Sequence, residues 1–322
     1  MSNSTRSDQA ACAAAIRAGS KTFFAASLLL PPRVRRPALA LYAFCRAADD
    51  AVDVGGEATE LTLLRERLVR IYAGRPINNA ADRALADVVA EHGIPRELPE
   101  ALLEGFAWDI EGRRYDDGEQ LSAYAARVAG AVGEMMAHLM NVRTPEALAR
   151  ASDLGIAMQL TNIGRDVGED ARAGRLYLPM QWLRQAGIEP EHWLRNPVCS
   201  EPIRAVVERL LSAADELYVR ADVGIKLLPR DCRPAIVAAR HLYAEIGHQL
   251  RRDGCDSLSR RTVVPTARKV TILGKTLVRS IAPARRGPTL GQRAEWLFTL
   301  FERLERRDRQ QPADRQQPDC AI

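Results

Sequence analysis

Two stretches of this chain, more than a hundred residues apart, each place acidic side chains four positions apart within an otherwise apolar helical pattern. At about 100° per residue, the polar side chains of each stretch share one helix face, about 60° wide in the first and about 80° wide in the second. The two faces consist of Tyr42, Arg46, Asp49 and Asp53, and of Gln159, Asn162, Asp166 and Asp170. A fold that buries these faces must supply a partner for their negative charge.

A divalent cation is the partner that this pattern favours. Carboxylates four positions apart repel each other by about 0.2–0.5 kcal/mol in an isolated helix, and a cation offsets that repulsion directly. Asn162 adds a neutral oxygen, which suits a hard ion. Mg²⁺ held by a few carboxylates usually shares its other positions with phosphate oxygens and water, so the pattern favours an enzyme for a diphosphate substrate.

The alternative is that both acidic faces are ordinary solvated helix surfaces. The residues around the first face are mostly apolar, and no Lys lies nearby to form a surface ion pair. Unpaired buried carboxylates cost several kcal/mol each, by the order-of-magnitude argument for buried charge. The occurrence of two matching faces in one chain therefore disfavours the surface alternative.

The rest of the chain also has a helical pattern, and we expect an all-α fold. Apolar residues recur at three- and four-residue spacing, and alternating β-branched runs are scarce. Pro31-Pro32 predicts the start of the helix with the first acidic face, and Gly55-Gly56 predicts its end. Residues 174–179 are expected to form a loop and 189–202 an irregular connection. Further helices are predicted at about 58–73, 80–92, 97–112, 119–141, 145–168, 203–227, 232–253, 264–280 and 290–307.

Length and composition limit the number of domains and indicate the cellular compartment. With 322 residues and 47% hydrophobic content, the chain can form a sizeable core. We predict one helical domain over residues 1–308, with the two acidic helices facing across a central cavity, and a disordered tail over 309–322. Six scattered cysteines favour free thiols in a reducing cytoplasm, and no apolar run is long enough for a spanning helix or a signal peptide.

Four motifs, in a fixed order, resemble the head-to-head prenyl synthases, the squalene and phytoene synthases. The resemblance covers roughly residues 12–270, and the second acidic motif is most similar to that of bacterial phytoene synthases. The motifs are Gly19-Ser20-Lys21-Thr22-Phe23-Phe24, Tyr42 to Asp53, Val128 to Glu134, and Asn162 to Asp170 running on to Gly174-Arg175-Leu176-Tyr177-Leu178-Pro179.

The resemblance implies an isoprenoid-synthase-type helical bundle and a Mg²⁺-dependent prenyltransferase, with Mn²⁺ as a conceivable substitute. Two geranylgeranyl diphosphates would condense through prephytoene diphosphate to 15-cis-phytoene in carotenoid biosynthesis. Loss of a proton ends that reaction, so no NADPH is expected, and the chain lacks a Gly-rich dinucleotide fingerprint.

Site residues are carried over from the same motifs, together with the two polar faces. The expected metal ligands are Asp49, Asp53, Asn162, Asp166 and Asp170. The expected substrate-binding residues are Ser20, Lys21, Tyr42, Arg46, Gln159, Arg165, Tyr243 and one of Arg260 or Arg261, with Arg261 favoured. Tyr42, Arg46 and the four aspartates are expected to be catalytic. Val128 to Gly133, Ala157, Met158, Phe23 and Phe24 are expected to wall the prenyl cavity, although small helical residues often serve close packing alone.

Other functions remain open at this stage. A squalene, presqualene diphosphate or dehydrosqualene synthase would use two farnesyl diphosphates, and chain length does not follow from the motifs. A non-catalytic assembly factor should have lost aspartates from the metal faces, and a helical binding module would bind neither Mg²⁺ nor diphosphate. The formal charge of +5 includes a late basic cluster, for which we expect peripheral membrane contact, while nucleic acid is disfavoured because no recognition motif is present. This cluster comprises Arg260, Arg261, Arg268, Lys269, Lys275, Arg279, Arg285 and Arg286.

Overall fold

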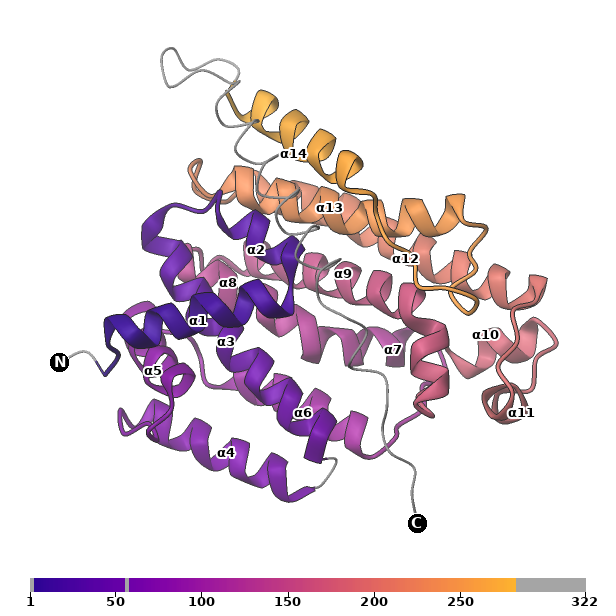
Figure 1. The fold of residues 1–322 in the computed structure, drawn as a ribbon, viewed down its shortest axis with the longest axis horizontal. Helices are drawn as coiled ribbons and strands as arrows, with labels where there is room; N and C mark the ends of the chain where they lie inside the picture. The colour runs from indigo at the N-terminus through magenta and orange to yellow at the C-terminus, as the bar shows by residue number, and fades with distance from the viewer. Residues whose placement is uncertain (1–2, 56–57, 282–322) are drawn as a thin grey trace, which may run out of the picture. The chain divides into compact units, whose positions relative to one another are not determined.

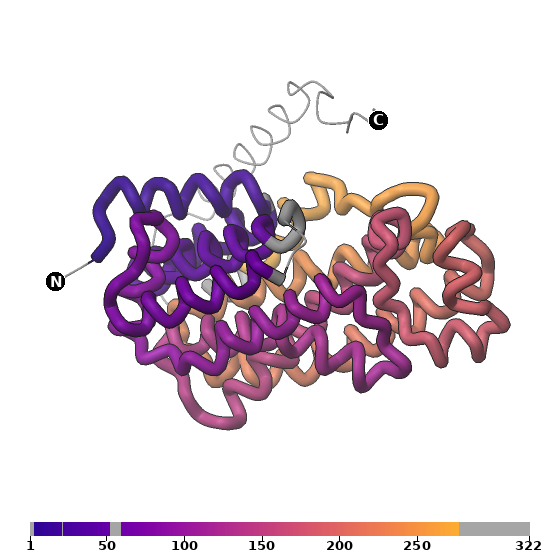
Figure 2. Tube along the Cα trace, turned by 90° about the horizontal axis from the view of Figure 1, so that it is seen from below, coloured from indigo at the N-terminus to yellow at the C-terminus, as the bar shows by residue number. Residues whose placement is uncertain are grey.

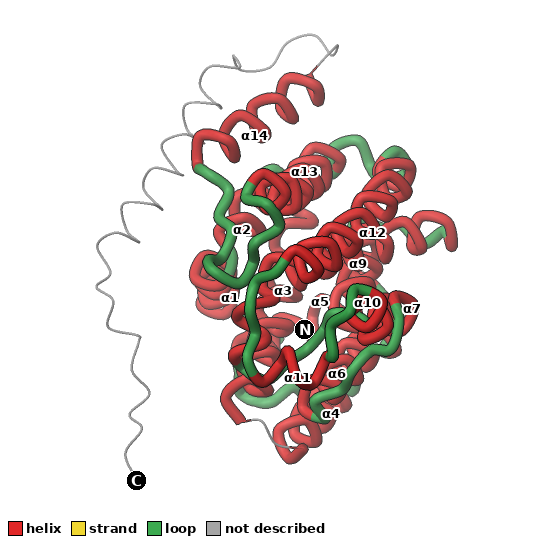
Figure 3. The backbone as a smooth tube through the Cα atoms, turned by 90° about the vertical axis from the view of Figure 1, so that its right-hand side faces the viewer, coloured by secondary structure: helices red, strands yellow, loops and turns green. Residues whose placement is uncertain are grey.

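The computed structural model describes residues 3–55 and 58–281, and every regular element within them is a helix (Figure 3). The all-α prediction is confirmed. In chain order the elements are α1 (Arg6–Gly19), α2 (Lys21–Ser27), α3 (Pro32–Gly55), α4 (Ala58–Tyr72), α5 (Ala80–His92), α6 (Glu97–Ile110), α7 (Gly118–Ala125), η1 (Ala126–Gly130), α8 (Ala131–Leu139), α9 (Pro145–Arg172), α10 (Met180–Gln185), α11 (Pro190–Arg195), α12 (Glu201–Ile225), α13 (Arg233–Arg252) and α14 (Thr266–Ile281).

The two helices with acidic faces are α3 and α9. α3 begins at Pro32, where the missing N–H of proline costs no helical hydrogen bond. α9 begins after Thr144, whose side chain accepts a hydrogen bond from the N–H of Ala147, and Pro145 occupies its first turn. The second acidic face therefore lies near the C-terminal end of a 28-residue helix.

Two predicted elements differ from the structure, and two others lie outside the described residues. The helix predicted over 119–141 is interrupted by the π-helical turn η1 at Ala126–Gly130. The connection predicted over 189–202 contains the short helix α11, which begins with Pro190 in its first turn. The helix predicted over 290–307 and the tail predicted over 309–322 lie outside the described residues, so the domain boundary at 308 stays a prediction.

Residues 1–263 form one unit by their contacts, and α9 lies at its centre. α9 packs against α8, η1, α12 and α13, while α3 packs against α1, α4 and α5 (Figure 1). Within this unit, α10 and α11 lie at the opposite end from α1 and α5 (Figure 2). Residues from Val264 onward form a second unit, of which the structure describes α14 and the residues that lead into it.

Glycines let α9 pack with backbone contact against η1 and α8. A Cβ added at Gly155 would lie 2.2 Å from the carbonyl oxygen of Ala129, and one added at Gly133 would lie 2.2 Å from the carbonyl oxygen of Ala151. No side chain fits at such distances, so these glycines set the separation of the helices. This close packing also positions η1 beside the central cavity.

Candidate active site

A cavity of about 330 Å³ lies inside the unit formed by residues 1–263. Its wall is mostly apolar and is formed by residues of α2, α3, η1, α8, α9, α12 and α13. Tyr42 and Cys45 of α3 line it together with Gln159 and Asn162 of α9. The Tyr42 end of the first polar face and the Gln159–Asn162 end of the second therefore open on the same cavity, whereas Asp49, Asp166 and Asp170 are not among its lining residues.

The predicted apolar wall is correct in part. Phe23, Val128, Ala129, Val132, Gly133 and Met158 line the cavity. Phe24, Gly130, Ala131 and Ala157 are instead buried in the surrounding packing. For Gly130 this packing is close, because an added Cβ would lie 2.6 Å from the hydroxyl oxygen of Ser152. The small residues of this region thus serve both the cavity and the helix contacts.

The first acidic face contains its own cation. Arg46 lies 3.3 Å from Asp49 through Nη1 and 2.5 Å from Asp50 through Nη2. The sequence argument considered only Lys as a partner for this face, and the structure corrects it: a guanidinium one turn earlier provides the pairing. The main chain of Asp53 belongs to α3, but its side chain lies outside the described residues.

The second acidic face has a carboxylate between two arginines. Asp166 accepts hydrogen bonds from Nε (2.7 Å) and Nη2 (2.5 Å) of Arg165. It also accepts from Nε (3.0 Å) and Nη2 (3.2 Å) of Arg261. One turn later, burial and then the charge of Asp166 raise the pKa of Asp170 to about 7. The face therefore combines carboxylates with guanidinium groups already turned toward Asp166.

Arg261 reaches Asp166 because the segment after α13 lies directly on α9. The N–H of Gly168 donates to the carbonyl oxygen of Ser257 at 3.1 Å, and a Cβ at Gly168 would lie 2.7 Å from that oxygen. Arg172 also donates to the carbonyl oxygen of Leu258 at 2.7 Å. Arg260, by contrast, pairs with Asp253. Of the two candidate arginines, Arg261 is the one at the acidic face.

Three aromatic rings connect α3, α2 and α13 beside the site. The ring of Phe23 lies 6.3 Å from that of Tyr42 and 5.0 Å from that of Tyr243. Burial raises the pKa of Tyr243 well above its usual range. The charge of Arg165 lowers this pKa, and the charges of Tyr42 and Asp166, one from each polar face, raise it further. The Tyr243 hydroxyl therefore lies near both polar faces.

The N-terminal motif places Ser20 at the start of α2. Its side chain accepts a hydrogen bond from the N–H of Phe23 at 3.2 Å, which makes Ser20 the N-cap of the helix. Ser20 also hydrogen-bonds the side chain of Tyr243. Lys21 is the first residue of α2, and its side chain lies outside the described residues.

The donor set fits a hard divalent cation. The Oδ1 atom of Asn162 is buried, and no hydrogen-bond partner for it exists among the described residues. Asn162 also lines the cavity, one turn from Asp166. Among the described side chains, however, no three His, Cys, Asp or Glu groups already converge on one point. The ligand types of the two faces, carboxylates and one amide oxygen, are nonetheless those that Mg²⁺ prefers.

Asp109 of α6 is a further half-buried group that the sequence analysis missed. It accepts hydrogen bonds from the hydroxyls of Tyr124 (2.8 Å) and Tyr177 (2.7 Å). Tyr177 lies in the loop after α9, and the charge of Asp109 contributes to the raised pKa of Asp170. An isolated Asp after a Trp gives no periodic signal, so only the three-dimensional contacts reveal this connection between α6 and the acidic face.

Comparisons with known proteins agree on the kind of protein that this site belongs to. A model of the family described as squalene/phytoene synthase matches residues 16–268. A phytoene synthase of Rhodobacter capsulatus is 54% identical over 85% of this chain and 82% of its own length. A phytoene synthase of Cereibacter sphaeroides is 49% identical over 94% of this chain and 95% of its own.

Two further relatives extend the comparison. A 15-cis-phytoene synthase of a Paracoccus species is 40% identical over 81% of this chain and 88% of its own. Among solved structures, a dehydrosqualene synthase superposes with a TM-score of 0.79 at 31% identity, covering 85% of this chain and 96% of that one. The similarity in fold therefore covers the helices that form both polar faces and the cavity.

Proposed function

The chain belongs to the squalene/phytoene synthase family, and we propose that it is a 15-cis-phytoene synthase, a prenyltransferase of carotenoid biosynthesis. The reaction joins two geranylgeranyl diphosphates head to head through prephytoene diphosphate. Relatives at 49% and 54% identity over most of the chain are phytoene synthases, which favours the C20 substrate within the family.

The main support for this proposal is that the site is amphipathic. One end of the cavity is formed by polar side chains of α3 and α9, and the remainder is mostly apolar, with Arg150 as its one charged residue among the described side chains. An allylic diphosphate has the same division, with a charged head and a long hydrocarbon. The cavity volume of about 330 Å³ falls within the range of pockets that hold small molecules.

We propose that the guanidinium groups bind the diphosphate oxygens. Arg46, Arg165 and Arg261 already lie against the acidic faces, and their charge-assisted hydrogen bonds would strengthen as negative charge develops on the departing group. Ser20 and Lys21 begin α2 next to Tyr243, so that end of the helix is proposed to hold the second diphosphate. Gln159 lines the cavity together with Tyr42 and Asn162.

Mg²⁺ held by the oxygen atoms of Asp49, Asp53, Asn162, Asp166 and Asp170 would neutralise the diphosphate and help it to leave. The raised pKa of Asp170 supports this assignment, because a bound cation would relieve the repulsion between Asp166 and Asp170. Tyr42 and Tyr243, with hydroxyls whose pKa burial raises, would stay protonated and orient the phosphates as hydrogen-bond donors. We propose that no NADPH takes part, since the reaction ends with loss of a proton.

A second candidate function is dehydrosqualene synthase. The structural similarity to such an enzyme at a TM-score of 0.79 supports this candidate. It would use the same polar faces with two farnesyl diphosphates, so the two candidates differ only in the hydrocarbon that the apolar part accepts.

Product analysis distinguishes these functions. The purified protein is incubated with Mg²⁺ and either the C15 or the C20 allylic diphosphate, with and without NADPH, and the products are identified by mass spectrometry. We expect a C40 triene from the C20 substrate in the absence of NADPH. A C30 product alone would assign the protein to the dehydrosqualene or squalene branch, and no product from either substrate in a folded sample would contradict an enzymatic function.

We also propose that the protein is cytoplasmic and binds peripherally to membranes. None of the described helices is long and apolar enough to cross a bilayer. Val219 and Val223 of α12 form an exposed apolar stripe with Leu227, which follows the helix; 66%, 50% and 42% of their respective surfaces are exposed. The exposed cations Lys226 and Arg230 lie beside this stripe. Apolar side chains flanked by cations suit the headgroup region of an anionic membrane.

A vesicle sedimentation assay tests the membrane proposal. Wild type should sediment with vesicles that contain about one third anionic lipid, and binding should weaken at high salt because the electrostatic part is screened. The variant Val223→Glu should lose most of the binding, while Leu63→Glu, at an exposed apolar position of α4, should not. Equal binding by both variants would show that α12 is not the contact surface.

A further inference from the structure

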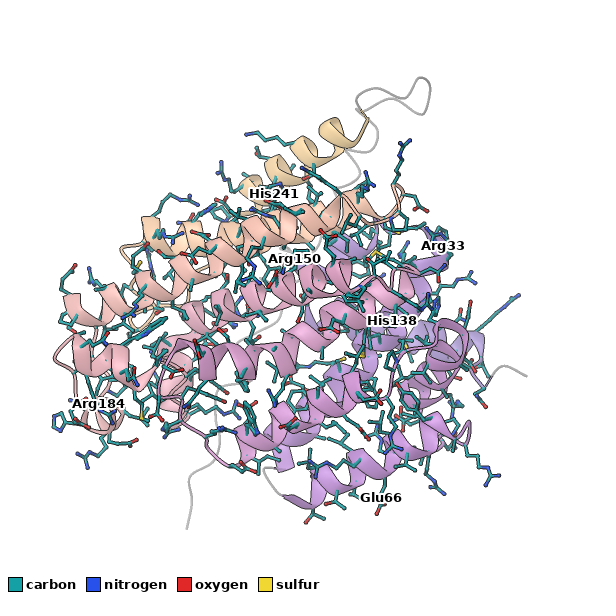
Figure 4. All side chains as sticks on the ribbon, turned by 180° about the vertical axis from the view of Figure 1, so that it is seen from behind. Arg33, Glu66, His138, Arg150, Arg184 and His241 are labelled. Atoms are coloured by element: carbon teal, nitrogen blue, oxygen red, sulfur yellow. The ribbon has the colours of Figure 1, made fainter. Side chains whose placement is uncertain are left out.

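Arg150 is the only residue with a formal charge among the described side chains that line the cavity. It projects from α9 where that helix runs beside α12 (Figure 4). A charged residue in an apolar wall requires a structural reason, because burial of an unpaired charge is costly. An Arg side chain suits such a position because its apolar stem can line the cavity while its guanidinium pairs elsewhere.

The pairing of Arg150 is provided by a buried carboxylate. Asp153 is only 4% exposed, and its Oδ2 lies 2.8 Å from Nε of Arg150. The other oxygen of Asp153 accepts a hydrogen bond from Arg220 of α12 at 2.7 Å. Arg220 is not among the lining residues. The two arginines thus share one carboxylate, and only Arg150 contacts the cavity.

Arg150 lies at the end of the cavity that is remote from the polar faces. The lining residues of α9 run from Asn162 back to Ala147, so Arg150 is within one turn of the far end. Twelve residues of α-helix separate Arg150 from Asn162, which corresponds to about 18 Å along the axis. This end also contains Gly224 of α12, where an added Cβ would lie 2.2 Å from the Cβ of Arg150. α12 and Asp153 therefore hold the Arg150 side chain in place from two sides.

We propose that Arg150 closes the far end of the prenyl cavity and sets the longest hydrocarbon that the enzyme accepts. A chain that enters with its diphosphate at Asn162 and Asp166 extends along α9 toward Arg150. A chain one isoprene unit longer must displace the paired guanidinium or bury its last carbons against it, and both are unfavourable. The inference rests on the proposed function, because it concerns the substrate preference of that same site.

Competition between substrates tests this role. The enzyme receives C20 and C25 allylic diphosphates together in detergent, and mass spectrometry gives the ratio of kcat/KM for C25 over C20. Arg150→Ala removes the guanidinium and most of the stem, so this ratio should rise at least about tenfold, the effect expected for a few methylenes in an apolar pocket. Arg150→Met fills the stem volume without charge and should give a smaller rise.

Arg220→Ala is the matched control. It removes the other partner of Asp153 without changing the cavity wall, so the C25 to C20 ratio should stay within about twofold of wild type. A rise of equal size in Arg220→Ala would show that the Asp153 pairs, and not the cavity end, set the preference. If Arg150→Ala does not fold by circular dichroism, Arg150→Val provides the same test with a larger apolar side chain.

The activity of wild type on the C20 substrate distinguishes an error in the role of Arg150 from an error in the proposed function, on which that role rests. If wild type converts the C20 substrate and Arg150→Ala leaves the ratio unchanged, the role of Arg150 is wrong and the proposed function stands. If folded wild type forms no C40 product from the C20 substrate, the proposed function is wrong, and the proposed role of Arg150 is then wrong as well.

Discussion

Asp166 accepts hydrogen bonds from Nε and Nη2 of Arg261, a residue 95 positions later in the chain, while it also pairs with its neighbour Arg165. A carboxylate with two guanidinium partners cannot be a free metal ligand in the same arrangement. Binding of a diphosphate would give the arginines new anionic partners and leave the oxygens of Asp166 to a cation. We propose that the pair couples substrate binding to the formation of the metal site.

The first prediction concerns the two adjacent arginines. Arg261→Ala removes a guanidinium from Asp166, whereas Arg260→Ala removes one from Asp253, away from the acidic face. A charge-assisted hydrogen bond is worth about 1.5–3 kcal/mol, so Arg261→Ala should raise KM for the diphosphate by about ten- to hundredfold. Arg260→Ala should leave KM within about threefold of wild type, within the modest effect of an exposed pair. Steady-state kinetics measure both, and the reverse ranking would assign the role to Arg260.

The second prediction concerns the aspartates themselves. Asp49→Asn and Asp166→Asn keep the shape of each side chain but remove the negative charge that a divalent cation needs for binding. Turnover should fall by at least about a hundredfold, as expected when a group that stabilises charge in the transition state is lost. The helical content measured by circular dichroism should not change. Retention of most activity at saturating Mg²⁺ by either variant would contradict the assignment of that residue.

The third prediction concerns the packing of α9. Gly155→Ala would place a Cβ 2.2 Å from a main-chain oxygen, and that backbone cannot move aside without separating the two elements. We expect a loss of about 1–3 kcal/mol in the free energy of unfolding, the usual cost of overpacking. Gly164→Ala, whose Cβ would lie 3.3 Å from a methyl group of Leu211, is the control. Its gain in helix propensity of about 1 kcal/mol should offset most of its strain, and urea denaturation measures both variants.

The acidic faces and the helices that carry them could be predicted because their signals are local. Residues three and four apart share a helix face, and Pro and Gly mark the ends of α3 and α9. The pairing of Arg46 with Asp49 and Asp50 is also local, because these residues are three and four positions apart on one helix.

The remaining contacts of the site depend on which segments meet in space. The position of Arg261 depends on the close approach of Ser257 to Gly168, and no periodicity links these two residues. The cluster around Asp109 and the closed end at Arg150 are equally non-local. Burial of a single charged residue becomes visible only when all its neighbours are placed.

The fourth prediction uses the ion pair that holds α1 against α5. Arg83 donates to Asp8 and, with the N–H of Thr5, holds the pKa of that carboxyl well below its usual range. Because the folded-state pKa is depressed, the stabilising contribution of Asp8 is complete above the ordinary Asp pKa of about 3.9 and is lost progressively as pH falls from there through the depressed folded-state pKa. Asp8→Asn should therefore lower the urea midpoint clearly at pH 7 and less at pH 2. An equal loss at both pH values would exclude the ionised carboxylate as the cause.

The fifth prediction concerns Asn162, whose buried Oδ1 has no partner among the described residues. A buried unsatisfied acceptor that lines a cavity costs about 1–3 kcal/mol unless a ligand satisfies it. Asn162→Leu removes that cost, so the metal-free variant should be at least as stable as wild type toward urea. If Asn162 is a metal ligand, the same variant should need about tenfold more Mg²⁺ for half-maximal activity. Asn162→Asp, which restores an oxygen ligand, should need less Mg²⁺ than Asn162→Leu. An unchanged Mg²⁺ requirement in Asn162→Leu would mean that this oxygen serves the substrate and not the metal.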